Sequence, residues 1–572
     1  MTEYGIDRFQ STRDRGKETI FYFTMEAGLS SEIPTYSGGL GVLAGDTLRS
    51  AADLGLPMVG VTMLWRNGYF KQEIDDDGWQ QEENAIWDYR SKLTKLDNYV
   101  RIKLEGESVR IEVWEYLIEG RHGHIIPVYF LDTNIAENPE HVRNLNQYLY
   151  GGDDRTRLCQ EVILGIAGVR ILRDIGYGNG QIYHLNEGHA SLLALELIRE
   201  SGYNSYDKVK RNCVFTTHTP VAAGHDEFSY DLLKQVLHPI YLEHLEGIIG
   251  QEHSLNLTTL SHKLSKYVNG VSQTHGKVAQ KMLDDDSIQA ITNGIHLPTW
   301  MHPAFQELFD EEIPGWKMDH SILVHTLQID DDKIVEAHKQ AKTALLEWVN
   351  QVYNTEMDPG KLTIGFARRA ATYKRADLLF TDLERLLEIA GGKLQLLYAG
   401  KAHPRDDQGK TLIQRVVQAG KKLGADIPLV YLEEYNMDIG ARLTAGCDVW
   451  LNNPRRPREA SGTSGMKAAV NGVLNFSVLD GWWVEGYIPG RTGWSIGPSA
   501  DLEDMESYDD SRDLEDLYQK LESEIIPTYY EDYSNWVSMM KESIALVGPY
   551  FNTNRMVREY AEYAYEILPQ YV

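Results

Sequence analysis

The small residues near position 460 have the composition of an anion-binding turn. They read GTSG from Gly462 to Gly465, and Lys467 follows two positions later. Glycines let a backbone approach a ligand closely, and a turn that opens a helix presents free N–H groups and hydroxyls to an anion. Lys467 beside such a turn can act as an ammonium clamp or as a Schiff-base amine, whereas an ordinary surface lysine is the alternative interpretation.

A basic segment, FARRAATYKRADLL, begins inside a predicted strand over Leu362–Ala367 and brings four cations to the carboxyl end of that strand. These cations are Arg368, Arg369, Lys374 and Arg375. Open α/β sheets bind ligands at that end of their strands. Two unit charges about 4 Å apart interact by roughly 4 kcal/mol at an effective dielectric of about 20, so the cluster can hold two phosphates side by side. A solvated basic face is the alternative, but it is less typical of a chain with a net charge of −28.

A glycine-rich segment lies in the other half of the chain. It reads YSGGLGVLAGD from Tyr36 onward, with Gly38, Gly39 and Gly41 ahead of a helical pattern. These glycines indicate that the backbone comes close to a ligand such as a phosphate or a sugar, but one loop of this kind does not say which. A ligand cleft between two domains would let this loop face the basic segment.

Other kinds of catalytic site are not indicated by the sequence. His184, Glu187 and His189 in HLNEGH lack the spacing of a helical zinc motif, so no metal site is predicted. No serine occupies a Gly-x-Ser-x-Gly elbow. The 84 acidic residues include no privileged pair for glycoside hydrolysis.

The composition limits the classes of function and location. With 56 basic and 84 acidic residues the net charge is −28, which argues against binding to a nucleic-acid backbone. No apolar stretch approaches the about 20 residues that a membrane-spanning helix needs, and the polar N-terminus lacks the apolar centre of a signal peptide. We therefore expect a soluble, cytoplasmic protein. Cys159, Cys213 and Cys447 are too far apart for a metal knuckle and odd in number, so we expect buried thiols.

Short β-branched and aromatic runs alternate with longer helical patterns, which is typical of parallel sheets covered by helices. In the second half of the chain these runs recur roughly every 20 to 35 residues, as βα units do. We therefore predict an α/β fold with two Rossmann-like domains, over residues 1–292 and 293–545, and a C-terminal helix over 546–572 that ties them together. The predicted strands are Ile20–Thr24, Met58–Leu64, Ile182–Leu185, Cys213–Thr217, Leu362–Ala367, Leu394–Ala399, Leu429–Leu432, Val449–Asn452 and Val473–Val478, and a helix is predicted over Ala190–Glu200.

Two segments near the C-terminus have patterns of their own. Residues 553–568 place apolar side chains on one helical face, so this helix must pack against an apolar surface. The acidic stretch DLEDMESYDDSRDLEDL, residues 501–517, is expected to be solvated, as are Asp284–Asp286 and Asp330–Asp332. The apolar face of the C-terminal helix consists of Met556, Val557, Tyr560, Ala561, Ala564, Ile567 and Leu568.

Six segments, in this order along the chain, resemble the α-glucan phosphorylases, the family of the glycogen, starch and maltodextrin phosphorylases. They are YSGGLGVLAGD, NEGHASLLALELI, FTTHTPVAAGHDEF, TNGIHLPTW, FARRAATYKRADLLF and EASGTSGMK, and the match extends from about Phe21 to Trp483. The resemblance implies two Rossmann-like domains of the GT-B glycosyltransferase type with a cleft between them. It also implies pyridoxal 5'-phosphate bound to Lys467, and transfer of the terminal glucose of an α-1,4-glucan or maltodextrin to orthophosphate with retained anomeric configuration. In that family the cofactor phosphate exchanges a proton with orthophosphate.

The resemblance further implies roles for individual residues, carried over by motif position. Those that would hold the cofactor are Arg368, Lys374, Tyr435, Thr463 and Ser464, with Trp300 beside its ring. Those that would hold orthophosphate are Arg369, Lys374 and the backbone of Gly39. Those that would bind the terminal glucose are Asn293, Glu459, Ser461 and Gly462, while Asn186, His189 and His218 would line the cleft.

The sequence departs from the longer members of that family at three positions. Asn436 replaces a basic residue that contacts the cofactor phosphate, Lys266 stands near the position of a cleft histidine, and Ala27 replaces an aromatic residue. Because the chain is also shorter than those members, no allosteric regulation is predicted, and a homo-oligomer is left open. Two other functions remain open: a GT-B glucan synthase that uses a nucleotide sugar, with Arg369 and Lys374 on its diphosphate, and a glucan-binding relative without catalysis.

Overall fold

The structure is a computed structural model that describes residues 19–178, 181–202, 205–221, 224–249, 253–498 and 510–571. These residues form two compact units. Unit 1 contains the described residues up to Phe70, Asn84–Ile291 and those from Thr553 onward, and unit 2 contains Lys71–Glu83 and Thr292–Asn552. Both units are α/β structures built on a mainly parallel sheet, so the predicted α/β fold class with two Rossmann-like parts is confirmed.

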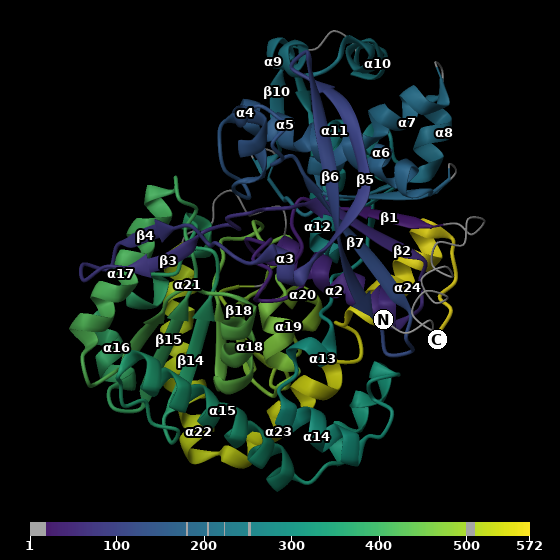
Figure 1. The fold of residues 1–572 in the computed structure, drawn as a ribbon. Helices are drawn as coiled ribbons and strands as arrows, with labels where there is room; N and C mark the ends of the chain where they lie inside the picture. Colours follow the sequence, from purple (N-terminus) through teal and green to yellow (C-terminus); the bar gives the residue numbers. More distant parts are fainter. Residues whose placement is uncertain are drawn as a thin grey trace. The chain divides into compact units, whose positions relative to one another are not determined.

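The described part of unit 1 has a nine-stranded sheet in the order β13-β12-β9-β8-β1-β2-β7-β6-β5. The strands from β13 to β7 are parallel, and β6 and β5 add an antiparallel edge of long strands (Figure 1). The order of strands reverses between β1 and β8, which makes the carboxyl ends of these two strands the expected ligand-binding edge. The bounds are β1 Ile20–Phe23, β2 Met58–Met63, β5 Thr94–Leu104, β6 Glu107–Glu119, β7 Ile125–Asp132, β8 Ile182–Asn186, β9 Cys213–Thr216, β12 Tyr267–Gly270 and β13 Gln289–Ala290, with a separate pair β10 Glu227–Ser229 and β11 Ser254–Asn256.

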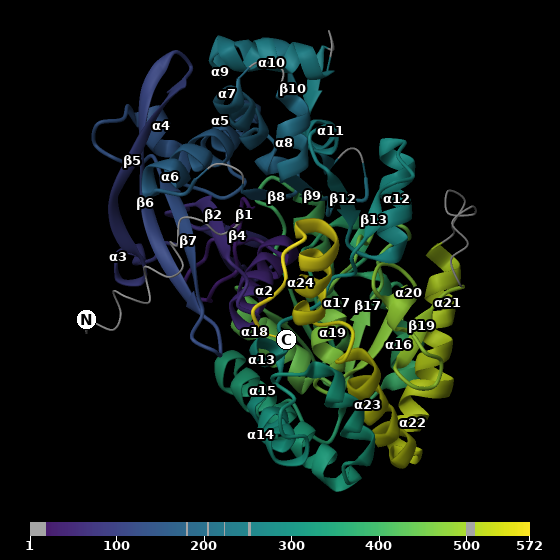
Figure 2. The ribbon, with the colours of Figure 1, turned by 90° about the vertical axis from the view of Figure 1, so that its right-hand side faces the viewer.

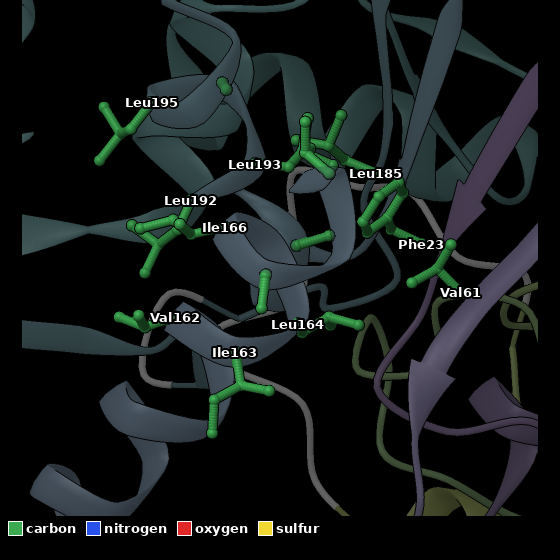
Figure 3. Packing of buried hydrophobic residues seen from close by; sticks show 14 of the residues in the cluster. Phe23, Val61, Val162, Ile163, Leu164, Ile166, Leu185, Leu192, Leu193 and Leu195 are labelled. Carbon is green, nitrogen blue, oxygen red and sulfur yellow. The ribbon is translucent and has the colours of Figure 1, made fainter. Parts of the chain in front are cut away.

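Helices cover the sheet of unit 1. The apolar run that begins at Val162 forms part of its core and packs against the helix that starts at Leu193 (Figure 3). The apolar character of this segment is therefore explained by its burial in the core of unit 1. The helical bounds are α2 Gly39–Asp53, α3 Tyr89–Lys92, α4 Glu140–Arg143, η1 Asn144–Asn146, α5 Asp154–Val162, η2 Ile163–Ala167, α6 Gly168–Ile175, η3 Gly188–Ala190, α7 Leu193–Ser201, α8 Tyr206–Asn212, α9 Tyr230–Val236, α10 Pro239–Ile249, α11 Leu257–Lys263, α12 Gln273–Leu283, α24 Thr553–Glu559 and η10 Tyr560–Tyr565.

The C-terminal helix packs on unit 1, beside α2 (Figure 2). Five of the seven predicted apolar positions are buried, and Ile567 is partly buried against the same cluster. The prediction is wrong for Leu568, which is 86% exposed. The cause is local, because Glu566 takes a left-handed φ of 59° and ends the helical geometry after Tyr565. Tyr565 is buried in its place and its hydroxyl lies 2.5 Å from His184 Nδ1.

Unit 2 has, in its described part, a parallel six-stranded sheet in the order β16-β15-β14-β17-β18-β19. This is the doubly wound order, with the reversal between β14 and β17. A hairpin of β3 and β4 joins unit 2 through two glutamines: Gln72 Nε2 donates to the Gly400 carbonyl at 2.8 Å and Gln80 Nε2 to that of Ala402 at 3.0 Å. The bounds are β3 Lys71–Ile74, β4 Gln80–Glu83, β14 Leu362–Ala367, β15 Leu394–Ala399, β16 Leu429–Leu432, β17 Val449–Asn452, β18 Leu474–Val478 and β19 Gly493–Ile496.

Helices α15 and α18 pack together on one face of this sheet and share a buried cluster with β14, β15 and β17 (Figure 1). None of the described helices, in either unit, combines the length and the apolar character that crossing a membrane requires. The bounds are α13 Leu297–Trp300, α14 Pro303–Glu312, η5 His320–Gln328, α15 Asp331–Tyr353, η6 Thr372–Lys374, η7 Leu378–Phe380, α16 Leu383–Ala390, α17 Asp407–Leu423, α18 Met437–Gly446, α19 Ser464–Ala469, α20 Trp483–Gly486, α21 Asp510–Lys520, η9 Leu521–Ile525, α22 Ile526–Glu531 and α23 Tyr533–Val547.

The smaller predictions can be checked in the same way. The three cysteines are free and buried, as expected, and burial raises the pKa of Cys159 to about 12. The acidic stretches at 284–286 and 330–332 lie at the surface. Residues 501–509 of the third acidic stretch lie outside the described residues, and at Asp513 the prediction of a solvated side chain is wrong, because this residue is fully buried against two arginines.

Candidate functional site

The carboxyl ends of β14 and β17 are joined by the side chain of Arg368. This arginine directly follows β14, and its two terminal nitrogens donate to Asn452, the last residue of β17, and to the carboxylate of Glu459. Arg368 and Glu459 are both 8% exposed. The predicted cofactor ligand and the predicted glucose ligand therefore form one buried ion pair at the point where the strand order of unit 2 reverses.

Buried charge surrounds Glu459. Burial alone would raise the pKa of this carboxyl, but the charges of Arg368 and Lys374 outweigh it and lower the pKa. Asp480 accepts hydrogen bonds from the backbone N–H groups of Glu459 and Gly481, each at 2.9 Å. Burial, with the added charge of Glu459, raises the pKa of Asp480 to about 7. Asp480 is not among the residues predicted from the sequence, although an Asp-Gly pair just after a strand is a signal for such a position.

Lys374 lies on the short turn η6 that follows the basic strand end. Burial lowers the pKa of its ammonium to about 7, and the charges of Arg368 and Arg369 act in the same direction. Arg369 itself is exposed. A lysine with a pKa of about 7 takes up a proton when an anion binds nearby, because a negative group favours the protonated form. Three of the four predicted cations, Arg368, Arg369 and Lys374, are thus close enough to act on one another, with Arg369 at the surface. The fourth, Arg375, pairs instead with Asp510 and Asp513.

The turn that contains Ser461 and Gly462 is held by close packing. Gly462 has a φ of +74°, a conformation that side chains disfavour, so glycine is required there. The Ser461 carbonyl accepts a hydrogen bond from the N–H of Trp482 at 2.9 Å. A Cβ on Gly481 would come within 2.3 Å of that carbonyl oxygen, so this neighbour must also be glycine. The segment after β18 therefore fixes the turn from outside.

Thr463 and Ser464 begin helix α19. The carbonyl of Thr463 accepts the N–H of Lys467 at 3.2 Å. The hydroxyl oxygen of Ser464 accepts the indole N–H of Trp450 at 3.0 Å, which leaves its own proton available to donate. Both predicted hydroxyl donors therefore lie at the start of the helix that carries the lysine.

Lys467 is only 7% exposed, so its interpretation as an ordinary surface lysine is wrong. Its Nζ lies 3.4 Å from the centroid of the Trp300 ring, and that tryptophan is 3% exposed. The side-chain amide of Asn471 donates to the carbonyls of Trp300, at 2.9 Å, and Lys467, at 2.8 Å. One asparagine thus links the backbone of Trp300 to that of Lys467.

Tyr435 and Asn436 precede helix α18. Burial raises the pKa of the Tyr435 phenol to about 12, against the opposing charge of Arg368, so this hydroxyl remains a proton donor at neutral pH. The side chain of Asn436 accepts the N–H of Ile439 at 3.0 Å and caps the helix. Asn436, which replaces a basic residue of the longer relatives, therefore stabilises the start of α18, because asparagine is among the best N-cap residues.

In unit 1 the carboxyl ends of β1 and β8 are joined by neutral groups. The amide nitrogen of Asn186 donates to Thr24 Oγ1 at 3.0 Å, and its oxygen lies 2.6 Å from Nε2 of His218. This oxygen is an acceptor, so His218 carries its proton on Nε2. Burial lowers the pKa of His218 to about 4, which keeps the ring neutral. The backbone N–H of His218 donates to the carboxylate of Glu187, whose φ of 74° is unusual for a glutamate.

His189 lies beside a buried ion network. Its Nε2 is 3.3 Å from the carboxylate of Asp226, which also accepts from Arg157 at 2.8 Å. Burial raises the pKa of the neighbouring Glu161 well above its usual range. The network orients the imidazole of His189, which has a partly exposed side chain.

Gly39 is the first residue of α2, and Glu26 organises the loop before it. The carboxylate of Glu26 accepts the N–H groups of Ser37, at 2.6 Å, and Gly38, at 3.3 Å. A Cβ on Gly38 or Gly39 would meet no atom within 4 Å, whereas one on Gly41 would lie 2.7 Å from the Glu26 carboxylate. Internal packing thus explains Gly41, whereas a side chain at Gly39 would meet open space, and the predicted role of Gly39 stays a prediction. Glu26 is not among the residues predicted from the sequence.

The remaining sequence-derived positions are placed as follows. Asn293 is buried, at 5% exposure, just before α13. Ala27 is fully buried; its N–H donates to the Thr35 carbonyl, and its carbonyl accepts from the Thr35 hydroxyl. Lys266 forms an ion pair with Glu566 at 3.0 Å. Gly39 and His189 belong to unit 1, and the other predicted cofactor, phosphate and glucose ligands belong to unit 2.

Comparison with known protein sequences shows the family of this chain. A sequence model described as carbohydrate phosphorylase matches residues 27–136 and 177–487. A maltodextrin phosphorylase of Thermococcus litoralis is 39% identical over 97% of this chain and 72% of its own length. Glycogen phosphorylases of Mycobacterium tuberculosis and Aquifex aeolicus are 36% and 35% identical, over 96% and 97% of this chain and 70% and 87% of their own lengths. The chain therefore belongs to the carbohydrate phosphorylase family and is a glycosyltransferase-type enzyme.

Proposed function

We propose that this enzyme is an α-1,4-glucan phosphorylase, which transfers the terminal glucose of glycogen or maltodextrin to orthophosphate and releases α-glucose 1-phosphate. The names of its relatives, maltodextrin phosphorylase and glycogen phosphorylase, support this substrate class. The observation that carries the proposal is Lys467, buried against Trp300 in the unit whose β14 end bears the basic cluster. A lysine that is buried against an aromatic ring, in the same unit as a basic cluster, is expected at a functional site.

The residues around Lys467 fit pyridoxal 5'-phosphate. Its phosphate needs cations and hydroxyl donors, which Arg368, Lys374 and Thr463 supply, and its flat ring suits the aromatic face of Trp300. Tyr435 and Ser464 add two further hydroxyls. When bound, the cofactor supplies a phosphate group that exchanges a proton with orthophosphate. Asn471 contributes indirectly, since it bonds to the backbone of both Trp300 and Lys467.

Orthophosphate would be held by the outer cations of the same cluster. Arg369 is exposed and can reach an arriving anion, and Lys374 takes up a proton as that anion approaches, because the pKa of its ammonium lies at about 7 without it. Two phosphate groups repel each other strongly at close range, so additional positive charge is needed at this place. The backbone N–H of Gly39 is proposed as a further donor.

The terminal glucose would be held by neutral and acidic groups. Glu459, Ser461 and Asn293 offer acceptors and donors to its hydroxyls. Within unit 1, the neutral His218 and Asn186 are proposed as further sugar ligands. A network of this kind selects one sugar, because an epimer leaves buried polar groups without partners. At two of the altered positions the side chains have other partners: Lys266 pairs with Glu566, and Asn436 caps α18.

The test uses the purified full chain with maltodextrin and orthophosphate. Release of glucose 1-phosphate is followed by a coupled assay, and the anomer is read by NMR to test retention. Borohydride reduction followed by mass spectrometry locates the cofactor, which is expected on Lys467. Glucan extension from a nucleotide-glucose, without phosphorolysis, would establish the synthase instead, and binding of maltodextrin without turnover would establish the non-catalytic relative.

A further inference from the structure

Helix α21 carries two acidic residues and lies beyond the part of the chain that the family's sequence model matches. The family match ends at residue 487, and α21 covers Asp510–Lys520. Asp510 and Asp513 lie in its first turn. Asp513 is fully buried, at 0% exposure, although the surrounding sequence is strongly acidic and polar. A buried carboxylate on an otherwise ordinary surface helix must have cationic partners.

Those partners are two buried arginines. One carboxylate oxygen of Asp513 lies 2.7 Å from Arg375 Nη2 and the other 2.8 Å from Arg456 Nη2. The arginine side chains are 4% and 2% exposed. Asp510 adds a second contact to Arg375, at 3.0 Å, but its own side chain is 35% exposed. Asp513 is therefore the carboxylate that holds both guanidinium groups in one place.

Arg375 belongs to the turn that bears Lys374. Its Nε donates to the Asn453 carbonyl at 2.8 Å, and the Asn453 amide donates back to the Arg375 carbonyl at 3.1 Å. The N–H of Arg455 donates to the Tyr373 carbonyl at 2.7 Å. The turn at 372–375 and the loop at 453–456 are thus bonded along their length, and an arginine from each of them meets Asp513.

We propose that Asp513 is a positioning residue of the orthophosphate site, which fixes the turn of Lys374 by holding Arg375 and Arg456 together. The inference rests on the proposed function, because Lys374 is the phosphate ligand there. A displacement of about 1 Å at a charged ligand can cost up to a hundredfold in rate, so a rigid support for this turn has a direct kinetic effect.

The sign of one measurement separates positioning from electrostatics. Asp513→Asn removes a negative charge near a phosphate site, which by charge alone would strengthen phosphate binding and lower its KM. Positioning predicts the opposite, a rise of about tenfold in the KM for orthophosphate with a change of about twofold or less in the KM for maltodextrin. A purely structural role would lower the thermal midpoint and leave both KM values unchanged. The matched control is Glu515→Gln on the same helix, an exposed partner of Arg385, which should change neither KM.

The experiment is performed on the holoenzyme with orthophosphate and maltodextrin varied separately. A KM for orthophosphate that stays within twofold of wild type, or falls, overturns the inference while wild-type phosphorolysis upholds the proposed function. A wild type without phosphorolysis overturns both. If Asp513→Asn is not recovered folded, Arg456→Lys decides, because it keeps the charge and shortens its reach to Asp513: a rise of about threefold in the same KM supports the inference, and no rise refutes it.

Discussion

The two units have the same arrangement of strands around their reversal points but opposite side-chain chemistry. In unit 1, β1 and β8 are joined by Thr24, Asn186 and the neutral His218. In unit 2, β14 and β17 are joined by Arg368, which is paired with Glu459. Both sites lie where an open α/β sheet is expected to bind a ligand, so the backbone does not distinguish them.

Under the proposed function, the neutral groups of unit 1 are sugar ligands, whereas unit 2 supplies the cationic phosphate ligands in addition to Glu459, Ser461 and Asn293 for the glucose. Neutral amides and imidazoles match the hydroxyls of a sugar, whereas guanidinium and ammonium groups match phosphate, and each group costs free energy when it is buried without its match. The fold alone would not have revealed this division, because many functions share it. Variants that remove one chemistry and spare the other test whether the division is real.

The largest effect is expected for Lys467→Ala. Loss of the buried amine should abolish covalent attachment of the cofactor and reduce phosphorolysis by about a thousandfold or more, with the fold preserved. Visible absorbance and intact-protein mass measure the first effect, and a coupled assay the second. Lys393→Ala, at an exposed position of the same unit, is the control. Substantial activity in Lys467→Ala would show that the cation-rich unit does not bind the cofactor as proposed.

Arg369→Ala should come next. Loss of one charge-assisted contact to orthophosphate should cost about 3 kcal/mol in the transition state, or roughly a hundredfold in kcat/KM for orthophosphate. The exposed Arg415 on α17 provides the control variant Arg415→Ala. If the two variants have the same kcat/KM for orthophosphate, Arg369 is not part of the site. The basic cluster of unit 2 would then need another explanation.

His218→Ala tests the neutral unit. Without the ring, the oxygen of Asn186 loses a donor at 2.6 Å and the sugar loses a neighbour, so kcat/KM for maltodextrin should fall by about tenfold. The KM for orthophosphate should not change. His141→Asn, at a position with a 44% exposed side chain, controls for the loss of a histidine. An effect on phosphate instead of glucan would contradict the division between the units.

The smallest effect concerns pH. The pKa of Lys374 is lowered to about 7, so its ammonium is present below that pH and is lost above it. The kcat/KM for orthophosphate should therefore fall by about eightfold between about pH 6.5 and about pH 8. His218, with a pKa of about 4, stays neutral throughout this range, so kcat/KM for maltodextrin should not follow.

Lys374→Arg provides the control for that profile. Arginine keeps its charge at every pH in the range, so the part of the decline that belongs to Lys374 should disappear, while the ionisation of orthophosphate itself is unchanged. A profile identical to that of the wild type would assign the decline to the substrate.

Prediction from the sequence succeeded where the strands are short apolar runs. All five strands predicted in unit 2 are confirmed, with bounds that differ by at most one residue. The long antiparallel strands Thr94–Leu104 and Glu107–Glu119 were missed, because exposed charged residues alternate with buried ones along them. Alternation, rather than an apolar run, marks strands with one solvated face. The acidic stretch that contains Asp513 was also misjudged, because the charge of a segment does not show which of its residues are buried.

The candidate site was predictable to a similar degree. The motifs located Lys467 and the cations after β14, whose types and spacing carry their chemistry. They did not locate Asp480 or Glu26, because these carboxylates act on backbone N–H groups of distant turns and have no motif of their own. Which acidic residue meets which turn is decided by strand order, and that order is known only once the sheet is built.

The division of unit 1 along the chain constrains how the protein is made. Its sheet is complete in the first 291 residues, yet Tyr560 and Tyr565 supply hydroxyl partners to Thr216 and His184 from the far end of the sequence. A ribosome must deliver the whole of unit 2 before these tyrosines emerge. During synthesis the apolar surface beside α2 therefore stays exposed until the C-terminal helix has been made. Nascent chains are most prone to aggregation or chaperone binding during this time.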